Sequence, residues 1–239
     1  MKKTGFTITE LLIVVVVVAI LAAVTVVAFR GIQQRASLAS VRADGASISK
    51  KLELFRVDSG LFPASITDCP NPSAGNLCLT PGSGTTVSYF AFNPSVPNRY
   101  GAATHTTNPP GYEIIVKSSS QFYYYSTAEI TSGNEFVQYV DLAPLIDQYG
   151  LRRYQFSFDI KSANTATQTT VNMYMQNGSD TRYTFGAAIP VTTTYQRQTV
   201  TLTPVGPNTG VAQSILAFYG VYGSGNRVTV RNMTIQPAL

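Results

Sequence analysis

The chain has 239 residues, a formal net charge of +5 and only 12% charged residues. A net charge this small gives no strong indication of a nucleic-acid-binding or polyanion-binding protein. Tyr and Gly are abundant, with 14 and 18 residues, and Trp is absent. This composition suits an exposed β-protein. After one long N-terminal helix is set aside, roughly 180 residues remain, which is enough for one large or two small domains.

The N-terminal segment is the most informative part of the sequence. The run from Leu11 to Phe29 contains no charged residue. As a helix it would be about 28 Å long, enough to cross a bilayer core of about 30 Å. Lys2 and Lys3 precede the run, and Glu10 lies at its edge.

Three interpretations of this segment are open. A secretory signal peptide is the first, although the apolar run exceeds the usual length of such a segment. A plain membrane anchor is the second, but it leaves Glu10 unexplained, because an ionised group in a membrane is costly. In the third, the chain is cut after Gly5, and the new α-amine on Phe6 pairs with the Glu10 carboxylate. Each of these charges offsets the desolvation cost of the other only when the two are paired.

The residues Lys2 to Gly5, followed by Phe-Thr-Ile-Thr-Glu-Leu-Leu-Ile-Val-Val-Val-Val, resemble the class III leader and N-terminal helix of type IV pilins. In that family, a prepilin peptidase cuts after the glycine and methylates the new amine. The resemblance implies that residues 1–5 are the leader, that Gly5 precedes the cut and that Phe6 is methylated. It also implies that Glu10 sets the register between subunits. Many members carry a proline within the apolar half of the helix, whereas this chain has none between Phe6 and Phe29.

The spacing of apolar residues predicts that the helix continues to residue 59. Residues 6–29 would form its membrane or filament core, and residues 30–59 would carry the head. Gly31 is a candidate bend, and Gly60, followed by Pro63, is the expected C-terminal cap. The predicted head-facing stripe consists of Leu38, Val41, Ile48, Leu52 and Phe55, with Gly45 within it.

Residues 60–130 are predicted to form a pilin-like head. Cys69 and Cys78 are the only cysteines and lie in a loop rich in Pro, Asn and Gly. In an exported head a disulfide between them is expected, adding on the order of 2–3 kcal/mol of stability. A metal site lacks the other ligands that zinc needs. Strands are predicted at Thr86–Phe92, Tyr112–Lys117 and Gln121–Thr127, the last two as a hairpin.

Residues 135–239 have a different sequence pattern, in which short segments of alternating apolar and polar residues are separated by turn signals. This pattern predicts an antiparallel β-sandwich. The segment resembles a jelly-roll of the carbohydrate-binding-module type, on the residues Tyr139–Leu142, Tyr154–Lys161 and Val228–Ile235. Sugar-binding versions of this fold often stack a sugar ring on an exposed aromatic side chain. Because Trp is absent, the candidates are Tyr174, Tyr183, Tyr195, Tyr219 and Tyr222.

A catalytic site is not indicated. The only histidine, His105, lies in a polar run without a neighbouring carboxylate or thiol, so a serine–histidine–aspartate triad would depend on this residue alone. No nucleotide-binding or metal-binding motif is present. Calcium binding stays open, because exported sandwiches sometimes bind this ion, but no Asp-rich loop points to a site. No cofactor is expected. Paired carboxylates for glycoside hydrolysis would have to come from Glu135, Asp141, Asp147, Asp159 or Asp180.

These observations predict a non-enzymatic α+β protein that serves as a subunit of a type IV pilus or related filament. Its expected partners are copies of itself, other pilins, the prepilin peptidase, the pilus assembly platform and the membrane. The C-terminal sandwich would bind a glycan or a cell surface. The precursor would lie in the cytoplasmic membrane and the assembled form on the cell surface.

Two other classes stay open. One is a pseudopilin of a secretion or DNA-uptake machine, and the other is a membrane-anchored enzyme. Nucleic-acid binding would require the arginines of the C-terminal segment to cluster on one face, with an affinity that falls steeply with salt. These are Arg152, Arg153, Arg182, Arg197, Arg227 and Arg231.

Overall fold

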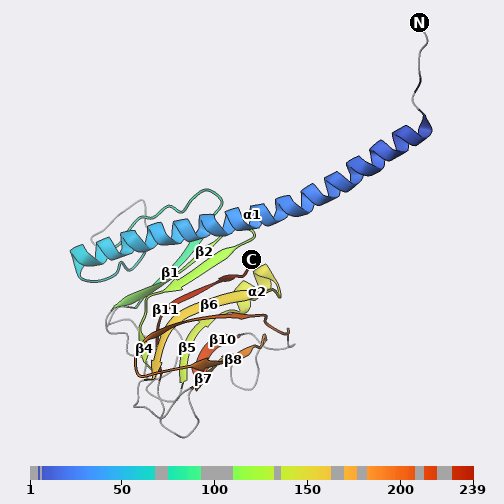
Figure 1. The fold of residues 1–239 in the computed structure, drawn as a ribbon. Coiled ribbons are helices and arrows are strands. Elements are labelled where there is room, and N and C mark those ends of the chain that lie inside the picture. Colours follow the sequence, from blue (N-terminus) through green and yellow to red (C-terminus); the bar gives the residue numbers. More distant parts are fainter. Residues whose placement is uncertain are drawn as a thin grey trace.

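The structure is a computed structural model that describes residue 5 and residues 7–67, 75–92, 110–131, 136–162, 170–176, 182–207, 213–219 and 228–239. One long helix lies across a body made of two antiparallel β-sheets (Figure 1). This arrangement confirms the predicted α+β class with a long N-terminal helix and a β-sandwich. In chain order, the elements are α1 (Ile8–Ser59), β1 (Thr86–Phe92), β2 (Gly111–Lys117), β3 (Phe122–Ser126), β4 (Ile130–Thr131), β5 (Phe136–Asp141), α2 (Ala143–Tyr149), β6 (Tyr154–Ser162), β7 (Thr170–Gln176), β8 (Gly186–Pro190), β9 (Gln196–Leu202), β10 (Ile215–Tyr219) and β11 (Val228–Pro237).

The long helix α1 ends at the residue that the sequence predicts. Gly60 is its C-cap, with a φ of 81°, a left-handed conformation that glycine adopts without steric cost. The helix is continuous through Gly31, so it does not break at the predicted candidate bend. Phe55 is half-buried. The predicted stripe otherwise faces the body, because the buried residues of α1 are Leu38, Val41, Gly45, Ile48 and Leu52.

Gly45 allows the closest approach of α1 to the sheet. A Cβ atom at this position would lie 2.8 Å from Cδ1 and 3.0 Å from Cε1 of Tyr123 on β3. Tyr123 in turn stacks on Tyr125, with ring centroids 6.3 Å apart and an interplanar angle of 18°. Alanine would have a higher helix propensity at this position, but its Cβ atom would prevent the close packing of the helix on the tyrosines.

Replacing Gly45 with leucine is expected to lower the free energy of unfolding by about 1–3 kcal/mol, because the new side chain overpacks the helix–sheet contact. Urea unfolding in detergent, followed by tyrosine fluorescence, measures this loss. Gly31→Leu is the matched control, since a Cβ at Gly31 meets nothing within 4 Å. Leucine raises the helix propensity at both positions, so equal losses for both variants would contradict the role given to the contact with Tyr123.

The larger sheet joins strands from distant parts of the chain. Its order is β1-β2-β3-β11-β6-β9, and β4 also pairs with β11. The predicted hairpin is present, with Lys117 of β2 opposite Phe122 of β3. On β11, Thr234 lies opposite Tyr125 of β3 on one side and opposite Ser157 of β6 on the other. The strands predicted for residues 60–130 and for residues 135–239 therefore share one continuous sheet.

The smaller sheet covers the inner face of the larger one and completes the main core. Its order is β5-β10-β7-β8. Across the interface, the rings of Phe158 on β6 and Phe218 on β10 meet edge to face, with centroids 4.7 Å apart. A second core lies between α1 and the outer face of β2, where Tyr112, Ile114 and Val116 are buried. Only the β1–β3 part of that outer face is covered by the helix (Figure 1).

The short helix α2 was not predicted. Asp141 precedes it, and the Oδ1 atom of Asp141 accepts a hydrogen bond from the backbone N–H of Ala143 at 3.0 Å. Pro144 lies in the first turn, where its missing N–H is not needed. Gly150 follows the last turn. The local signal for a helix was therefore present, but α2 has only 7 residues, too few for a helical period of apolar residues to be recognised.

Several buried tyrosines give the fold a defined sensitivity to alkaline pH. Burial raises the pKa of Tyr149 to about 12 and also raises the pKa values of Tyr89 and Tyr112. The Tyr149 hydroxyl donates to the backbone oxygen of Ser118 at 2.8 Å. The unfolded chain releases phenolic protons near pH 10 (about the usual tyrosine pKa), while the folded chain retains them.

Stability is therefore expected to be constant with respect to these groups below about pH 10 and to fall as the pH rises above it, because the unfolded state then binds fewer protons. Thermal unfolding at a series of pH values in detergent tests this expectation. Tyr149→Phe removes one of the groups and should make the alkaline decline shallower. A melting temperature that stays flat up to about pH 11.5 would contradict the assignment.

Candidate functional site

The N-terminus of α1 is closed by a reciprocal cap. The backbone N–H of Thr7 donates to Oε2 of Glu10 at 2.8 Å, and the Thr7 hydroxyl donates to the same oxygen at 2.8 Å. In return, the backbone N–H of Glu10 donates to the Thr7 hydroxyl at 3.3 Å. This capping box satisfies backbone groups that have no partner within the helix.

The cap places the Glu10 carboxylate beside the predicted processing point. Glu10 is exposed, and its Oε1 atom has no hydrogen-bond donor among the described residues. Gly5 is described and has open space around it, whereas Phe6 and the two leader lysines lie outside the described residues. The carboxylate therefore remains accessible to a positive group from the same chain or from another one.

The first half of α1 is an apolar rod that touches no other part of the described chain. An 18-residue window of this helix has a mean hydropathy of 3.4, with none of it buried, so by length and composition it could cross a membrane. Thr25, the polar residue within it, donates its hydroxyl to the backbone oxygen of Ala22 at 2.9 Å. Figure 1 shows this half projecting from the body as a gently curved extension. Its exposed large side chains are Ile8, Leu11, Leu12, Ile13, Val14, Val15, Val16, Val17, Val18, Ile20, Leu21, Val24, Val26, Val27 and Phe29.

The cysteine loop is only partly described. Cys78 forms a backbone bridge with Thr67, and it is not a free thiol. Cys69 lies outside the described residues. The Cys69–Cys78 disulfide therefore stays a prediction.

The predicted aromatic platforms lie in different surroundings. Tyr183 is only 5% exposed, and its hydroxyl donates to Oδ1 of Asp147 at 2.6 Å, so it offers no open ring face. The ring of Tyr195 already has cations over it, with Cζ of Arg231 at 3.7 Å and Nζ of Lys161 at 4.5 Å from its centroid. Neither ring is therefore free to stack on a ligand.

Two other candidates are brought together. Tyr174 of β7 and Tyr219 of β10 are half-buried, with ring centroids 6.0 Å apart and an interplanar angle of 54°. Tyr174 alternates along β7 with the buried Met173 and Met175, so it lies on the outer face of the smaller sheet. Tyr222 lies outside the described residues. The sequence alone could not join Tyr174 to Tyr219, because their strands are separated by β8 and β9 along the chain.

Asp159 organises the outer face of the larger sheet. It accepts hydrogen bonds from Nη1 of Arg197 at 3.1 Å and from Nδ2 of Asn232 at 2.7 Å. Asn232 has a φ of 51° at the irregular point of β11, where the register shifts between Arg231 and Thr234. Arg197 also donates to the backbone oxygen of Asn232 at 2.8 Å. The carboxylate thus holds the irregular part of β11 in place, which is a structural role.

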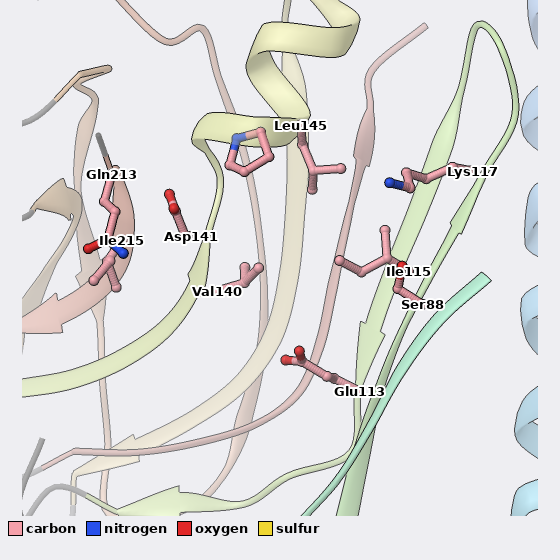
Figure 2. Close-up of a pocket in the computed structure, with 10 residues that line it drawn as sticks. Ser88, Glu113, Ile115, Lys117, Val140, Asp141, Leu145, Gln213 and Ile215 are labelled. Atoms are coloured by element: carbon pink, nitrogen blue, oxygen red, sulfur yellow. The ribbon is translucent and has the colours of Figure 1, made fainter. Parts of the chain in front are cut away.

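A cleft with a volume of about 520 Å³ opens between the two sheets. One wall comes from β1 and β2, and the other from the end of β5, the start of α2 and the start of β10 (Figure 2). Its lining combines apolar side chains (Ile115, Val140 and Leu145) with ionisable ones (Glu113, Lys117 and Asp141). A small polar molecule with one apolar face could be held there by hydrogen bonds.

The polar groups of this cleft also tie the body together. Glu113 is 2% exposed and accepts a hydrogen bond from the Tyr124 hydroxyl at 3.1 Å. The Oδ1 atom of Asp141 accepts from the backbone N–H groups of Ala143 and Ser214, at 3.0 and 2.8 Å. It thereby joins β5, α2 and the segment before β10. Figure 2 shows the Lys117 amine extending from β2 toward the opposite wall.

The described residues form no arrangement that supports a catalytic site or a nucleic-acid surface. His105, Glu135 and Asp180 lie outside them, and no group of three or more His, Cys, Asp or Glu side chains that could hold a metal occurs among those described. Arg227 also lies outside. Three of the arginines that a DNA surface would need are paired with carboxylates: Arg182 with Asp147, Arg197 with Asp159, and Arg231 with Glu129.

Comparisons with known proteins agree with the N-terminal geometry. Residues 1–26 match the family model of the prokaryotic N-terminal methylation motif. The match confirms the predicted resemblance of this segment and indicates a pilin-like or pseudopilin-like N-terminus. A comparison with curated proteins found no match.

Several solved structures are similar to part of the chain, and all of those named here are carbohydrate-binding modules. One described as CBM4 is 17% identical, with a TM-score of 0.29, and the match covers 63% of this chain and 86% of that one. The family 11 module of the cellulosomal cellulase Lic26A-Cel5E of Clostridium thermocellum is 16% identical, with a TM-score of 0.27 and coverage of 66% and 85%. A family 29 module is 13% identical, with a TM-score of 0.28 and coverage of 63% and 89%. Identities and TM-scores this low carry no information on what this chain binds.

Proposed function

We propose that this protein is a subunit of a type IV pilus or a closely related filament and that it assembles through the first half of α1. The observation that carries the proposal is an exposed apolar helix of membrane-spanning length, preceded by the methylation motif. A soluble protein would bury such a surface, whereas a filament of parallel helices buries it between subunits. The same rod holds the subunit in the membrane before assembly.

In this mechanism, the prepilin peptidase cuts after Gly5 and leaves a methylated amine on Phe6. The exposed Glu10 carboxylate pairs with the new amine of a neighbouring subunit as the helices bundle. An unpaired charge is costly in an apolar filament core, so only the stagger that pairs these groups is stable. The chemistry of assembly is therefore electrostatic matching and apolar burial, and the protein itself performs no catalysis.

The body is proposed to serve as the displayed, adhesive part of the filament. The adjacent Tyr174 and Tyr219 rings on the outer face of the smaller sheet are the best-placed aromatic surface among the predicted candidates. Aromatic faces stack on sugar rings and on apolar ligands alike, so a glycan or a partner-cell surface is the proposed target. Tyr174→Ala combined with Tyr219→Ala should reduce adhesion of intact filaments, with Tyr183→Phe as the control, since Tyr183 is buried.

The deciding experiment is mass spectrometry of the intact protein and of its N-terminal peptide, from sheared surface filaments and separately from membranes. A chain that begins at methylated Phe6 in the filament fraction supports the proposal. A processed chain found only in membranes supports a pseudopilin instead. A chain that begins beyond Ala28, or one that retains Met1 in both fractions, would overturn the filament assignment. The N-terminal segment would then be a signal peptide or a plain membrane anchor.

A further inference from the structure

The end of the body nearest the apolar rod carries a group of cations. They come from α1 and from the segment that follows α2, and we call them the basic collar: Arg30, Arg35, Arg42, Arg152 and Arg153. None of the five forms an ion pair with an acidic residue in the described part of the chain. Figure 1 shows that α2 and the C-terminus lie at the same end of the body from which the exposed half of α1 emerges.

Direct contacts place three members of the collar, Arg42, Arg152 and Arg153, beside the helix and on both of its sides. On one side, Arg42 and Arg153 line the same hollow of about 270 Å³, and Nε of Arg42 donates to Oε1 of Gln236 at 2.7 Å. On the other side, Nη2 of Arg152 donates to the backbone oxygen of Ser120 at 2.9 Å. The Ser120 hydroxyl in turn donates to that of Ser37 on α1 at 3.1 Å. The partners of Arg42 and Arg152 are neutral groups, so these hydrogen bonds do not neutralise either positive charge.

Few negative charges offset the collar. Asp147 on α2 is paired with Arg182 at 3.1 Å, and Asp44, the next acidic residue along α1, accepts a hydrogen bond from the Thr85 hydroxyl at 2.8 Å. Leu239 carries the C-terminal carboxylate and lines the hollow that Arg42 and Arg153 share. Asp44 and this carboxylate keep their negative charges, but the five arginines outnumber them, so the face as a whole is positive.

When the apolar rod spans a bilayer, Arg30 and Arg35 lie at the height of the membrane surface, about 2 and 9 Å along the helix axis from Phe29, and Arg42 lies about 20 Å from it. From Phe29 to Leu38, the first buried residue of α1, the rise along the axis is about 13 Å. The polar headgroup layer occupies roughly 5–7 Å of that distance. The remainder is close to the Debye length of about 8 Å at physiological salt, and the usual helix tilt of about 20° brings one flank closer. Leu151 and Leu239, which are 49% and 62% exposed, lie beside the arginines and suit a headgroup boundary.

We infer that the basic collar docks the body of the membrane-held subunit onto a bilayer surface of anionic phospholipid. Guanidinium groups bind phosphate oxygens through paired hydrogen bonds, which suits arginine better than lysine for this contact. The contact fixes the orientation of the body before assembly and is released when the helix leaves the membrane. The inference rests on the proposed function, because it requires α1 to span the membrane.

The absence of tryptophan makes a clean test available. The full-length chain with Leu151→Trp carries a single tryptophan next to the collar, and it is inserted into nanodiscs that contain a lipid with a spin label on its headgroup. Docking brings the tryptophan to the headgroups and quenches its fluorescence. We expect strong quenching in nanodiscs with about one third phosphatidylglycerol, weak quenching in pure phosphatidylcholine and a loss of quenching at about 0.5 M salt.

Matched charge reversals identify the residues responsible. Arg35→Glu with Arg153→Glu should lower the ratio of docked to undocked protein by about tenfold or more. Lys50→Glu with Lys51→Glu makes the same change in net charge at exposed positions, but about 22 Å farther along the helix from Arg35. This control should leave quenching unchanged.

The outcomes separate this inference from the proposed function. A chain that fails to insert into any nanodisc contradicts the proposed function itself. A chain that inserts but is quenched equally in neutral and anionic nanodiscs, or that responds equally to both double variants, overturns the docking alone. Loss of duplex DNA retention in Arg35→Glu/Arg153→Glu, without a change in quenching, would also overturn it and assign the collar to nucleic acid.

Discussion

Glu10→Val should abolish filaments while leaving processing intact. The carboxylate is exposed at the start of an otherwise apolar rod, and no described residue donates to its Oε1 atom. In the proposed filament core, the only compensating charge is the Phe6 amine of a neighbour. Removing the carboxylate leaves that amine buried without a partner. We expect the yield of sheared filaments to fall by about tenfold or more, with the membrane fraction still beginning at Phe6.

A second role of Glu10 must be separated from the first. Glu10 also forms the capping box with Thr7, so its loss weakens the start of the helix. Thr7→Val is the matched control, because it removes the capping hydroxyl and keeps the carboxylate. Filaments are expected to form with Thr7→Val. If they form equally well with Glu10→Val, or equally poorly with both variants, then pairing with the amine does not set the register.

Removing β11 should unfold the whole body, including the strands that precede residue 131. β11 lies between β3 and β6 in the larger sheet. Four of its side chains, Val228, Val230, Met233 and Ile235, are fully buried in the core between the sheets. A chain that ends at residue 227 loses these contacts and exposes two unpaired strand edges. We expect rapid proteolysis of this chain in detergent and the loss of its near-ultraviolet circular dichroism.

Two controls make the truncation decisive. A chain that lacks only Ala238 and Leu239 keeps β11 complete and should fold. A single substitution tests the same strand: Ile235→Asp buries an unpaired charge and should cost several kcal/mol. Thr199→Asp, on the exposed outer face of β9, should cost about 1 kcal/mol or less. Persistent protection of β1, β2 and β3 in the truncated chain would show that residues 60–130 fold without β11.

The elements that the sequence predicts well are those whose signal is local. The capped end of α1 at Gly60 follows from glycine, which adopts the required positive φ without steric cost. The buried stripe of α1 follows from helical spacing, and the β2–β3 hairpin follows from two apolar runs joined by a short polar turn. The methylation motif is likewise contiguous, so its match requires no tertiary structure, and the roles proposed for Gly5, Phe6 and Glu10 follow from the sequence alone.

Local sequence patterns did not predict the helix α2, and they could not show which tyrosines have an accessible ring. The spacing of tyrosines along the chain does not distinguish Tyr183, whose ring is buried against Asp147, from Tyr174, whose ring lies beside Tyr219. Likewise, nothing in the sequence places Arg153 next to Arg42, because these residues meet only when the end of the body packs on α1.

By itself the sequence determined that this protein has an N-terminal methylation motif and an apolar helix of membrane-spanning length joined to a β-rich body, because each of these features is a short-range pattern of charge and hydrophobicity. Only the tertiary structure decided that the body is held together by β11. Pairing between strands is set by packing across the whole sheet. β11, the last strand in the sequence, lies between β3 and β6 and forms backbone hydrogen bonds with both. The same long-range packing brings the arginines of α1 and of the segment after α2 together at the end of the body from which the apolar rod emerges.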